Sequence, residues 1–193
     1  IPKLFYNNSM MRILLVVVAF LVGMLWGKSS SAVEYNLISE KDTPEIYCLA
    51  QNILFEASTE PVAGKIAVGL VVLNRVKDTR YPNTICEVVK QGPIYESWKT
   101  RNNPDLKPDE RVYFPVKHRC QFSWYCDGKS DKIRPTENWY KSQIVALQLM
   151  DGKFNGVIEG ATHYHASWVF PKWRHTLTYI AQVGDHLFYR WEK

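Results

Sequence analysis

The feature that most constrains the fold is a pair of adjoining apolar segments between residues 44 and 77. In the first, apolar residues recur at intervals of three and four, which predicts a helix over 44–57 with one buried face. Thr43 suits the N-cap of this helix, and Pro44 suits its first position. The second segment, 61–77, is apolar almost throughout, and its length favours a buried helix over a strand. We therefore expect two largely buried helices in close succession.

The remaining predicted elements are shorter and of both kinds. Thr84 and Glu87 have the spacing of a capping box, which predicts a short helix ending near Gly92. Residues 93–119 are polar and without clear period, and we expect a long surface loop of the kind that often serves function. Further patterns predict an extended piece over 121–125, a helix over 136–150, a strand over 161–170 and a hairpin over 178–191. The fold class is therefore predicted to be α+β, dominated by helices, with a small β-hairpin region.

Residues 1–32 differ in composition from the rest of the chain. Lys3 and Arg12 precede an apolar run of 14 residues over 13–26, and small residues follow up to Ala32. This pattern is typical of a secretory signal peptide cleaved after Ala32, because a spanning helix needs about 20 apolar residues. An uncleaved signal anchor is the alternative.

The leader divides the chain into three parts. We expect a linker over 33–43 and a folded functional domain over 44–193. The protein is predicted to be exported to the periplasm or cell envelope, where it contacts the membrane only through its N-terminal segment. A monomer is expected.

The charge of the chain argues against a nucleic-acid partner. Its formal net charge is +5, and this falls to +2 when the three cations of residues 1–32 are set aside. No basic cluster interleaved with aromatic residues is present. The small positive excess suits an anionic cell-wall polymer, and the 7 Trp and 11 Tyr residues suit either a stacking groove or an aromatic core.

The four cysteines agree with export. All of them follow the leader, and none forms a CxxC pair. In an oxidising compartment we expect two disulfides, for which three connectivities are open. The pairing that we favour joins Cys120 to Cys126 and Cys48 to Cys86. A zinc site made of all four thiolates is the alternative, and their irregular spacing disfavours it.

Glu56 is the candidate for catalysis, because it lies near the end of an otherwise apolar helix. Leu54, Phe55 and the next helix would desolvate its carboxyl group, and burial raises the pKa of a carboxylic acid. A raised pKa is what a general acid needs at neutral pH. The alternative is a solvated helix-end carboxylate that pairs with Lys65 or Arg75.

Several ordered blocks of the sequence resemble the SleB/CwlJ-type cell wall hydrolases. The first block, 53–68, contains Glu56 and is followed without a gap by 72–76 and 81–89. Later blocks occur at 120–123, 161–166 and 184–190, so the resemblance covers roughly 45–190. It departs from the common pattern at Ser58-Thr59, where many members have Arg-Gly, and in the long segment 93–119.

This resemblance implies a lysozyme-like helical core and an enzyme that cuts peptidoglycan. Members of the family that have been studied act as lytic transglycosylases, so Glu56 is expected to protonate the MurNAc–GlcNAc glycosidic bond. It would then help the muramoyl 6-hydroxyl to close a 1,6-anhydro ring. Lysozyme-type hydrolysis of the same bond is the alternative, and it usually needs a second carboxylate. Glu60, Asp127 and Asp185 are the candidates for that role. For Glu60 we favour a structural charge past the end of the helix, and for Asp127, which lies between Cys126 and Gly128, we favour turn chemistry.

Six further residues are candidates for binding the glycan: Gln121, Phe122, Ser123, Tyr164, His165 and Trp173. Polar side chains among them would bind acetamido groups, and the rings would stack on sugars. For Phe122, packing in the core is an equal alternative.

Two other functions remain as alternatives. His163 and His165 share one face of a predicted strand, and His175 or His186 would complete the ligands of a zinc amidase or peptidase. No HExxH motif accompanies them, so we assign no metal and no cofactor. The last alternative is a wall-binding module without activity.

Overall fold

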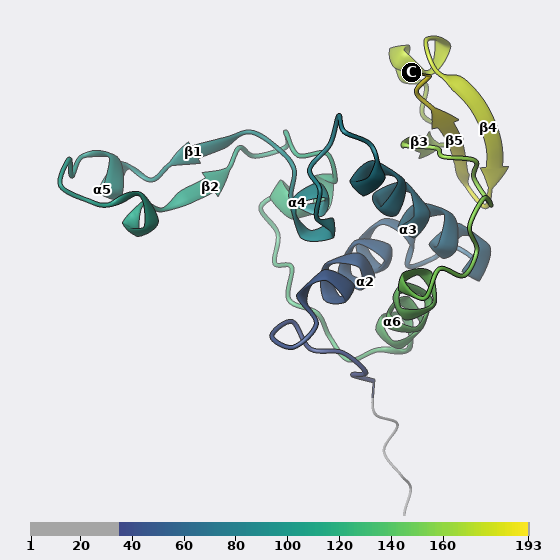
Figure 1. Ribbon diagram of the computed structural model, residues 1–193, viewed down its shortest axis with the longest axis horizontal. Helices are drawn as coiled ribbons and strands as arrows, with labels where there is room; N and C mark the ends of the chain where they lie inside the picture. The colour runs from purple at the N-terminus through teal and green to yellow at the C-terminus, as the bar shows by residue number, and fades with distance from the viewer. Residues whose placement is uncertain (1–34, 193) are drawn as a thin grey trace, which may run out of the picture. The chain divides into compact units, whose positions relative to one another are not determined.

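The computed structural model describes residues 35–192, and the predicted leader, 1–32, lies outside this range. Over the described residues, no helix combines the length and the apolar character that crossing a membrane requires. The fold is α+β, as predicted, with a helical body, a small C-terminal sheet and a two-stranded arm (Figure 1).

The helical body consists of α2 (Pro44–Ala57), α3 (Val62–Lys77), the short α4 (Ile85–Val89) and α6 (Glu137–Met150). Apolar side chains from all four helices form the core, and α3 is buried along most of its length. Gly69 lets α3 approach its neighbours closely, because a Cβ atom there would lie 2.5 Å from a methyl carbon of Leu149 on α6. The two helices predicted over 44–57 and 61–77 are confirmed almost to the residue.

The helix caps follow the sequence in two cases and depart from it in one. Thr84 accepts a hydrogen bond from the backbone N–H of Glu87, and Thr136 accepts one from Trp139, as capping residues do. Thr43 caps nothing with its side chain, because its hydroxyl donates instead to the carbonyl of Ser39.

We expected residues 33–43 to be a linker. The described part of this segment, from residue 35 on, is attached to α6. The amide of Gln143, which is fully buried, accepts from the backbone N–H of Leu37 and Ile38 and donates to the carbonyl of Tyr35. The indole of Trp139 donates to the side chain of Asn36. Residues 35–38 are therefore part of the folded domain.

The C-terminal sheet has the order β3-β5-β4 and is antiparallel. Its strands are β3 (His163–Ala166), β4 (Thr178–Val183) and β5 (His186–Arg190). The predicted hairpin is confirmed, and Gly184 supplies the positive φ of +59° at its turn. The strand predicted over 161–170 is shorter, because the chain turns after Ala166 and leaves Trp168 and Phe170 exposed.

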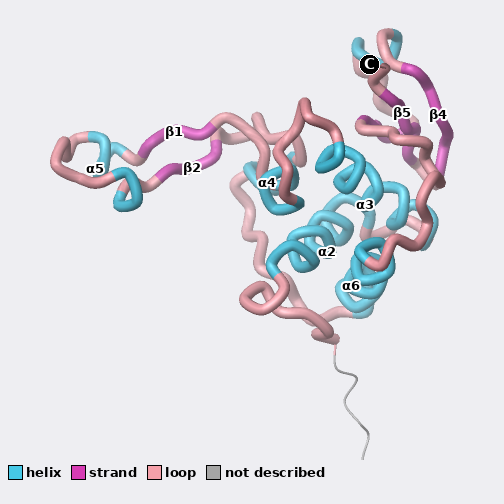
Figure 2. Tube along the Cα trace, in the orientation of Figure 1, coloured by secondary structure: helices cyan, strands magenta, loops and turns pink. Residues whose placement is uncertain are grey.

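Residues 93–119 were expected to lack regular structure, and most of this segment forms an arm (Figure 2). The arm contains β1 (Ile94–Glu96), the short helix α5 (Trp98–Arg101), the 3-10 helix η1 (Pro108–Glu110) and β2 (Tyr113–Pro115). The surface location expected for this segment agrees with its exposure, whereas the extended piece predicted over 121–125 is wrong. A 3-10 helix, η2 (Ser123–Cys126), occupies most of it, because the Cys120–Cys126 disulfide closes this stretch into a compact turn.

Both disulfides have the pairing that we favoured. Cys48 joins α2 to Cys86 on α4, and Cys120 joins Cys126 across a loop. Neither pairing follows from the spacing alone, since two other connectivities were open.

Candidate active site

Glu56 lies in the last turn of α2 and lines a cavity of about 360 Å³. The residues around it come from α2, from η2 and from the loop that leads to α6. They are Phe55, Glu56, Ser123, Trp124, Asp127, Lys129, Ser130 and Asp131. A carboxyl group at the end of an apolar helix therefore faces a space that can receive a ligand.

The immediate environment of Glu56 contains one direct partner and one nearby cation. The phenol of Tyr164, on β3, donates a hydrogen bond of 2.9 Å to Oε2 of Glu56. Burial raises the pKa of Glu56, while this hydrogen bond and the positive charge of Arg75 lower it less, so the net shift is upward. Because Oε2 accepts from Tyr164, the proton of the neutral acid belongs on Oε1.

The two cations that could have paired with Glu56 are used elsewhere. Nζ of Lys65 donates to three backbone carbonyls at the end of α2, those of Ala57, Ser58 and Glu60, at 2.6–2.9 Å. The guanidinium of Arg75 is buried, donates to the carbonyl of Thr162 and stacks on the rings of Tyr81 and Phe122. Arg75 therefore acts on Glu56 through its charge.

One wall of the cavity is built on the same helix as Glu56. The indole of Trp124 stacks on Phe55, with ring centroids 4.6 Å apart, and donates a hydrogen bond of 3.0 Å to Asn52. Asn52 lies one turn before Glu56 and is fully buried. Phe55 was named from the sequence only as a desolvating neighbour, and Trp124 was missed.

Two further carboxylates line this cavity with Glu56. Asp127 has a lowered pKa because its side chain accepts from the backbone of Lys129. Asp131 has a raised pKa, chiefly through burial and secondarily through the charge of Asp127. From the sequence, Asp127 was assigned to turn chemistry and Asp131 was missed.

Glu60 is only four residues beyond Glu56 but belongs to different surroundings. It is buried past the end of α2, and its Oε2 accepts a hydrogen bond of 3.1 Å from the backbone of Asp185 in the β4–β5 turn. Its Oε1 lies 3.5 Å from Nδ1 of His186. Glu60 does not line the cavity of Glu56, and its contacts fasten the hairpin to the helical body.

The predicted glycan-binding residues fall into three groups. Ser123 lines the cavity and Tyr164 bonds to Glu56. Gln121 is exposed beside Ser123, whereas Phe122 is buried beneath the guanidinium of Arg75. His165 and Trp173 form the third group and belong to a separate aromatic cluster.

In this aromatic cluster the imidazoles already have partners. The ring nitrogens of His165 lie 2.9 Å from the carbonyl of Ala166 and 3.1 Å from the hydroxyl of Tyr189. The indole of Trp173 packs against the rings of His163 and His165, and burial, with nearby Arg charges, lowers the pKa of His163 to about 4. Within residues 35–192, no three His, Cys, Asp or Glu side chains gather in a metal-binding arrangement.

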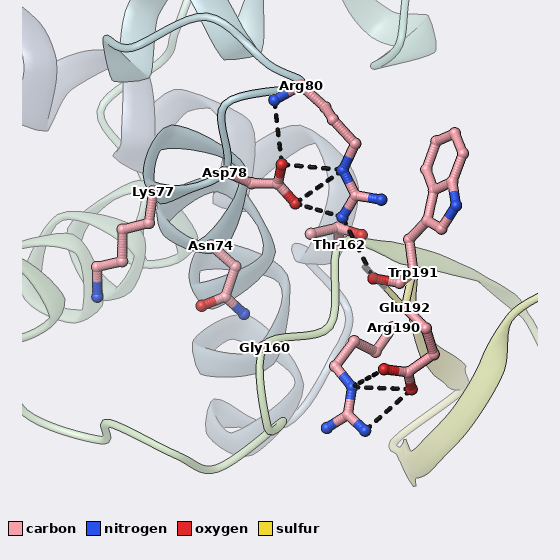
Figure 3. A pocket seen from close by; sticks show the side chains of 9 residues that line it. All are labelled: Asn74, Lys77, Asp78, Arg80, Gly160, Thr162, Arg190, Trp191 and Glu192. Carbon is pink, nitrogen blue, oxygen red and sulfur yellow. Dashed lines mark hydrogen bonds and ion pairs between the residues drawn. The ribbon is translucent and has the colours of Figure 1, made fainter.

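A second cavity, of about 530 Å³, shares no residue with the first (Figure 3). Charged side chains dominate it, and four of them are paired within the protein. Arg80 binds the carboxylate of Asp78, and Arg190 binds that of Glu192. These pairs leave the cavity with little net charge, which makes it a weaker candidate for an active site.

The family of the protein follows from its sequence. The model of the Cell Wall Hydrolase family matches residues 59–189. The chain belongs to this family. The SleB/CwlJ-type resemblance is thereby confirmed, and the matched range begins three residues after Glu56, so the role of Glu56 depends on the geometry described above.

A relative found by sequence agrees with this assignment. The spore cortex-lytic enzyme of Bacillus cereus is 22% identical over 144 residues, which is 75% of this chain and 43% of the relative. The chain thus spans less than half the length of that enzyme.

Two solved structures share the fold. The catalytic domain of the germination-specific lytic transglycosylase SleB from Bacillus anthracis has a TM-score of 0.51 and 23% identity, and the match covers 80% of this chain and 98% of that one. The catalytic domain of SleB from Bacillus cereus has a TM-score of 0.50 and 22% identity, with 86% and 99% covered.

Proposed function

We propose that this cell wall hydrolase cleaves the glycan strands of peptidoglycan between MurNAc and GlcNAc as a lytic transglycosylase, with Glu56 as the catalytic residue. The observation that carries the proposal is the state of Glu56, whose carboxyl group has a raised pKa, faces a cavity and accepts one hydrogen bond from Tyr164. Family membership and the SleB-like fold support it.

The first step needs the protonated form of Glu56. Its acidic proton passes to the glycosidic oxygen while the bond from that oxygen to the muramoyl anomeric carbon breaks. Burial keeps the acid protonated at a pH where an exposed glutamate would be ionised. The leaving GlcNAc keeps the transferred proton as its 4-hydroxyl group.

The second step uses the carboxylate that the first step leaves behind. The phenol of Tyr164 and the charge of Arg75 both stabilise this anion. The carboxylate removes the proton of the muramoyl 6-hydroxyl, whose oxygen attacks the anomeric carbon and closes the 1,6-anhydro ring. Glu56 regains its proton, and no water is consumed.

Hydrolysis is the second candidate, because Asp127 and Asp131 line the same cavity as Glu56. Either carboxylate could orient a water molecule toward the anomeric carbon, and the product would then carry a reducing MurNAc end. Glu60 supports this candidate less, since its carboxylate is engaged by the hairpin turn.

Digestion of purified peptidoglycan, followed by mass spectrometry of the products, tests the proposal. Wild-type protein should release anhydro-muramoyl ends, which are lighter by one water than the ends of hydrolysis, and EDTA should not prevent this. Glu56→Gln should release none while still binding the polymer. Reducing ends would instead establish hydrolysis, and new free amino groups would show peptide cleavage and overturn the proposal.

We also propose that the protein works outside the cytoplasm, in the periplasm or cell envelope. The supporting observations are the leader-like composition of residues 1–32 and the two disulfides. Cell fractionation with N-terminal sequencing of the recovered protein tests this. A protein found only in the cytoplasm, with reduced cysteines, would contradict it.

A further inference from the structure

The arm formed by residues 94–115 exposes an unusual number of large apolar side chains. Six of them, in the strands, at the start of α5 and just before β2, are each 45–64% exposed: Ile94, Tyr95, Trp98, Val112, Tyr113 and Phe114. In Figure 1 the arm extends away from the helical body. The exposed fractions of these six side chains show that the core does not cover them. Tyr95 and Phe114 lie on one face of the two-stranded ribbon, and Ile94 and Tyr113 lie on the other, so apolar side chains are exposed on both faces. Apolar exposure of this extent marks a binding surface.

Polar contacts, rather than these apolar side chains, maintain the shape of the arm. The backbone of Ser97 donates to the carbonyl of Val112 at 2.7 Å, and the buried hydroxyl of Thr100 accepts from the backbone of Val112. Arg111 forms an ion pair of 2.8 Å with Glu96. The aromatic rings are therefore available to a partner, and only Tyr95 and Phe114 pack on each other across the strands.

The base of the arm is continuous with the wall of the Glu56 cavity. The backbone of Val116 donates to the carbonyl of Pro93, and that of His118 donates to the carbonyl of Cys126. Cys126 ends η2, which supplies Ser123 and Trp124 to the cavity. Backbone hydrogen bonds therefore connect the base of the arm to the segment that forms one wall of the cavity.

We propose that the arm is a second binding surface for the peptidoglycan glycan strand, which holds the polymer beyond the sugars that occupy the Glu56 cavity. This inference rests on the proposed function. Flat aromatic side chains suit the faces of sugar rings, because each offers a large apolar area and, in Tyr and Trp, a polar group at its edge.

The charges of the arm balance, with Lys99, Arg101, Lys107 and Arg111 against Glu96, Asp105, Asp109 and Glu110. A surface without net charge suits the uncharged sugar rings of a glycan strand. A membrane surface fits less well, because the far end of the arm is polar and contains Asp105 and Asp109. The exposed apolar residues lie along both faces of the strands instead, so a linear polymer can lie along the length of the arm.

The test compares a double variant of the arm, Trp98→Ala with Tyr113→Ala, with the control Trp168→Ala, whose indole is equally exposed outside the arm. On intact sacculi, kcat/KM of the arm variant should fall tenfold or more, while a soluble tetrasaccharide should be cleaved within twofold of wild type. The control should match wild type on both substrates. Thermal unfolding of each variant checks its fold.

A binding assay separates this inference from the proposed function. In a Glu56→Gln background, the arm variant should lose at least tenfold in affinity for sacculi and the control should not. Equal affinity of the arm variant and the control would overturn the role of the arm, whether or not cleavage is ever seen. Loss of binding to phosphatidylglycerol vesicles, with unchanged binding to sacculi, would overturn it in favour of a membrane surface.

Discussion

The end of α2 and the turn that follows it carry two glutamates in opposite situations. Glu56 belongs to the helix, faces a cavity and has a raised pKa because it is desolvated with one direct hydrogen-bond partner. Glu60 is more deeply buried, yet the backbone of Asp185 in the β4–β5 turn donates a hydrogen bond to its Oε2, and the imidazole of His186 on β5 lies 3.5 Å from its Oε1. Burial alone therefore does not identify a catalytic acid. The difference lies in which groups the surrounding chain directs at the carboxyl oxygens.

Lys65 binds the stretch of backbone that lies between Glu56 and Glu60. Its ammonium group fills the space at the end of α2 and binds carbonyls on both sides of it, including that of Glu60. Because these carbonyls bind its ammonium group, Lys65 does not form an ion pair with Glu56. The following predictions sharpen this contrast, from the largest expected effect to the smallest.

Glu56→Gln should reduce kcat by about 10²–10⁴-fold, the usual contribution of a general acid, because the amide cannot donate a proton to the leaving oxygen. The rate of glycan cleavage on purified peptidoglycan measures this. Glu60→Gln is the matched control and should retain activity within a few-fold. A Glu60 variant as inactive as the Glu56 variant would remove the contrast between them.

Lys65→Met should destabilise the fold by about 3–5 kcal/mol, because three carbonyls at the end of α2 lose a buried charged donor. Urea unfolding followed by fluorescence measures the loss. Lys77→Met, which changes an exposed lysine of the same helix, should cost less than about 0.5 kcal/mol. Similar values for both variants would mean that the carbonyls of α2 do not need Lys65.

Glu60→Gln should cost about 1–2 kcal/mol, since the amide keeps the bond from Asp185 but loses the charge beside His186. Gly184→Ala should damage the same contact from the other side, because its Cβ would lie 1.8 Å from Oε2 of Glu60. Thermal unfolding of the two single variants and the double variant tests this coupling. Additive losses would show that the two positions act independently.

Tyr164→Phe should move the alkaline limb of the pH–activity profile to higher pH. The phenol lowers the pKa of Glu56 by favouring its anion, so its loss lets burial raise that pKa further. Cleavage rates across the pH range give the shift. A limb that stays in place, or moves to lower pH, would contradict the role assigned to Tyr164.

The smallest effect concerns the pH dependence of stability. The pKa of Glu56 is higher in the folded protein than the unperturbed 4.5, so the stability that its neutral form contributes is lost as pH rises through the raised value. The Glu56→Gln variant has no titrating group at this position, so it does not lose this stability as the pH rises. Its stability relative to wild type should therefore increase from pH 4 to pH 8, which thermal unfolding at both pH values measures.

The helices were predictable because each carries its own signal. Residues 44–57 show the helical period, and the Thr84 and Thr136 caps lie directly before the helices they begin. The turn at Gly184 was equally local. For such elements, the neighbours in sequence are also the determinants of structure.

The arm and much of the site lacked such signals. The strands of the arm have only three residues each, too few to show alternation, and the contacts between them span the whole segment. The bond from Tyr164 to Glu56 joins residues 108 positions apart. Asp131 sits in a loop without period, and only the path of that loop past α2 places it in the cavity.

The attachment of Trp124 has a consequence for how the site behaves when the protein moves. Asn52 and Phe55 hold this indole from the helix that also carries Glu56. A tilt or shift of α2 therefore displaces the carboxyl group of Glu56 and the indole of Trp124 together, as one rigid unit. Fluctuations of the surrounding loops can widen or narrow the opening without changing the alignment of these two groups.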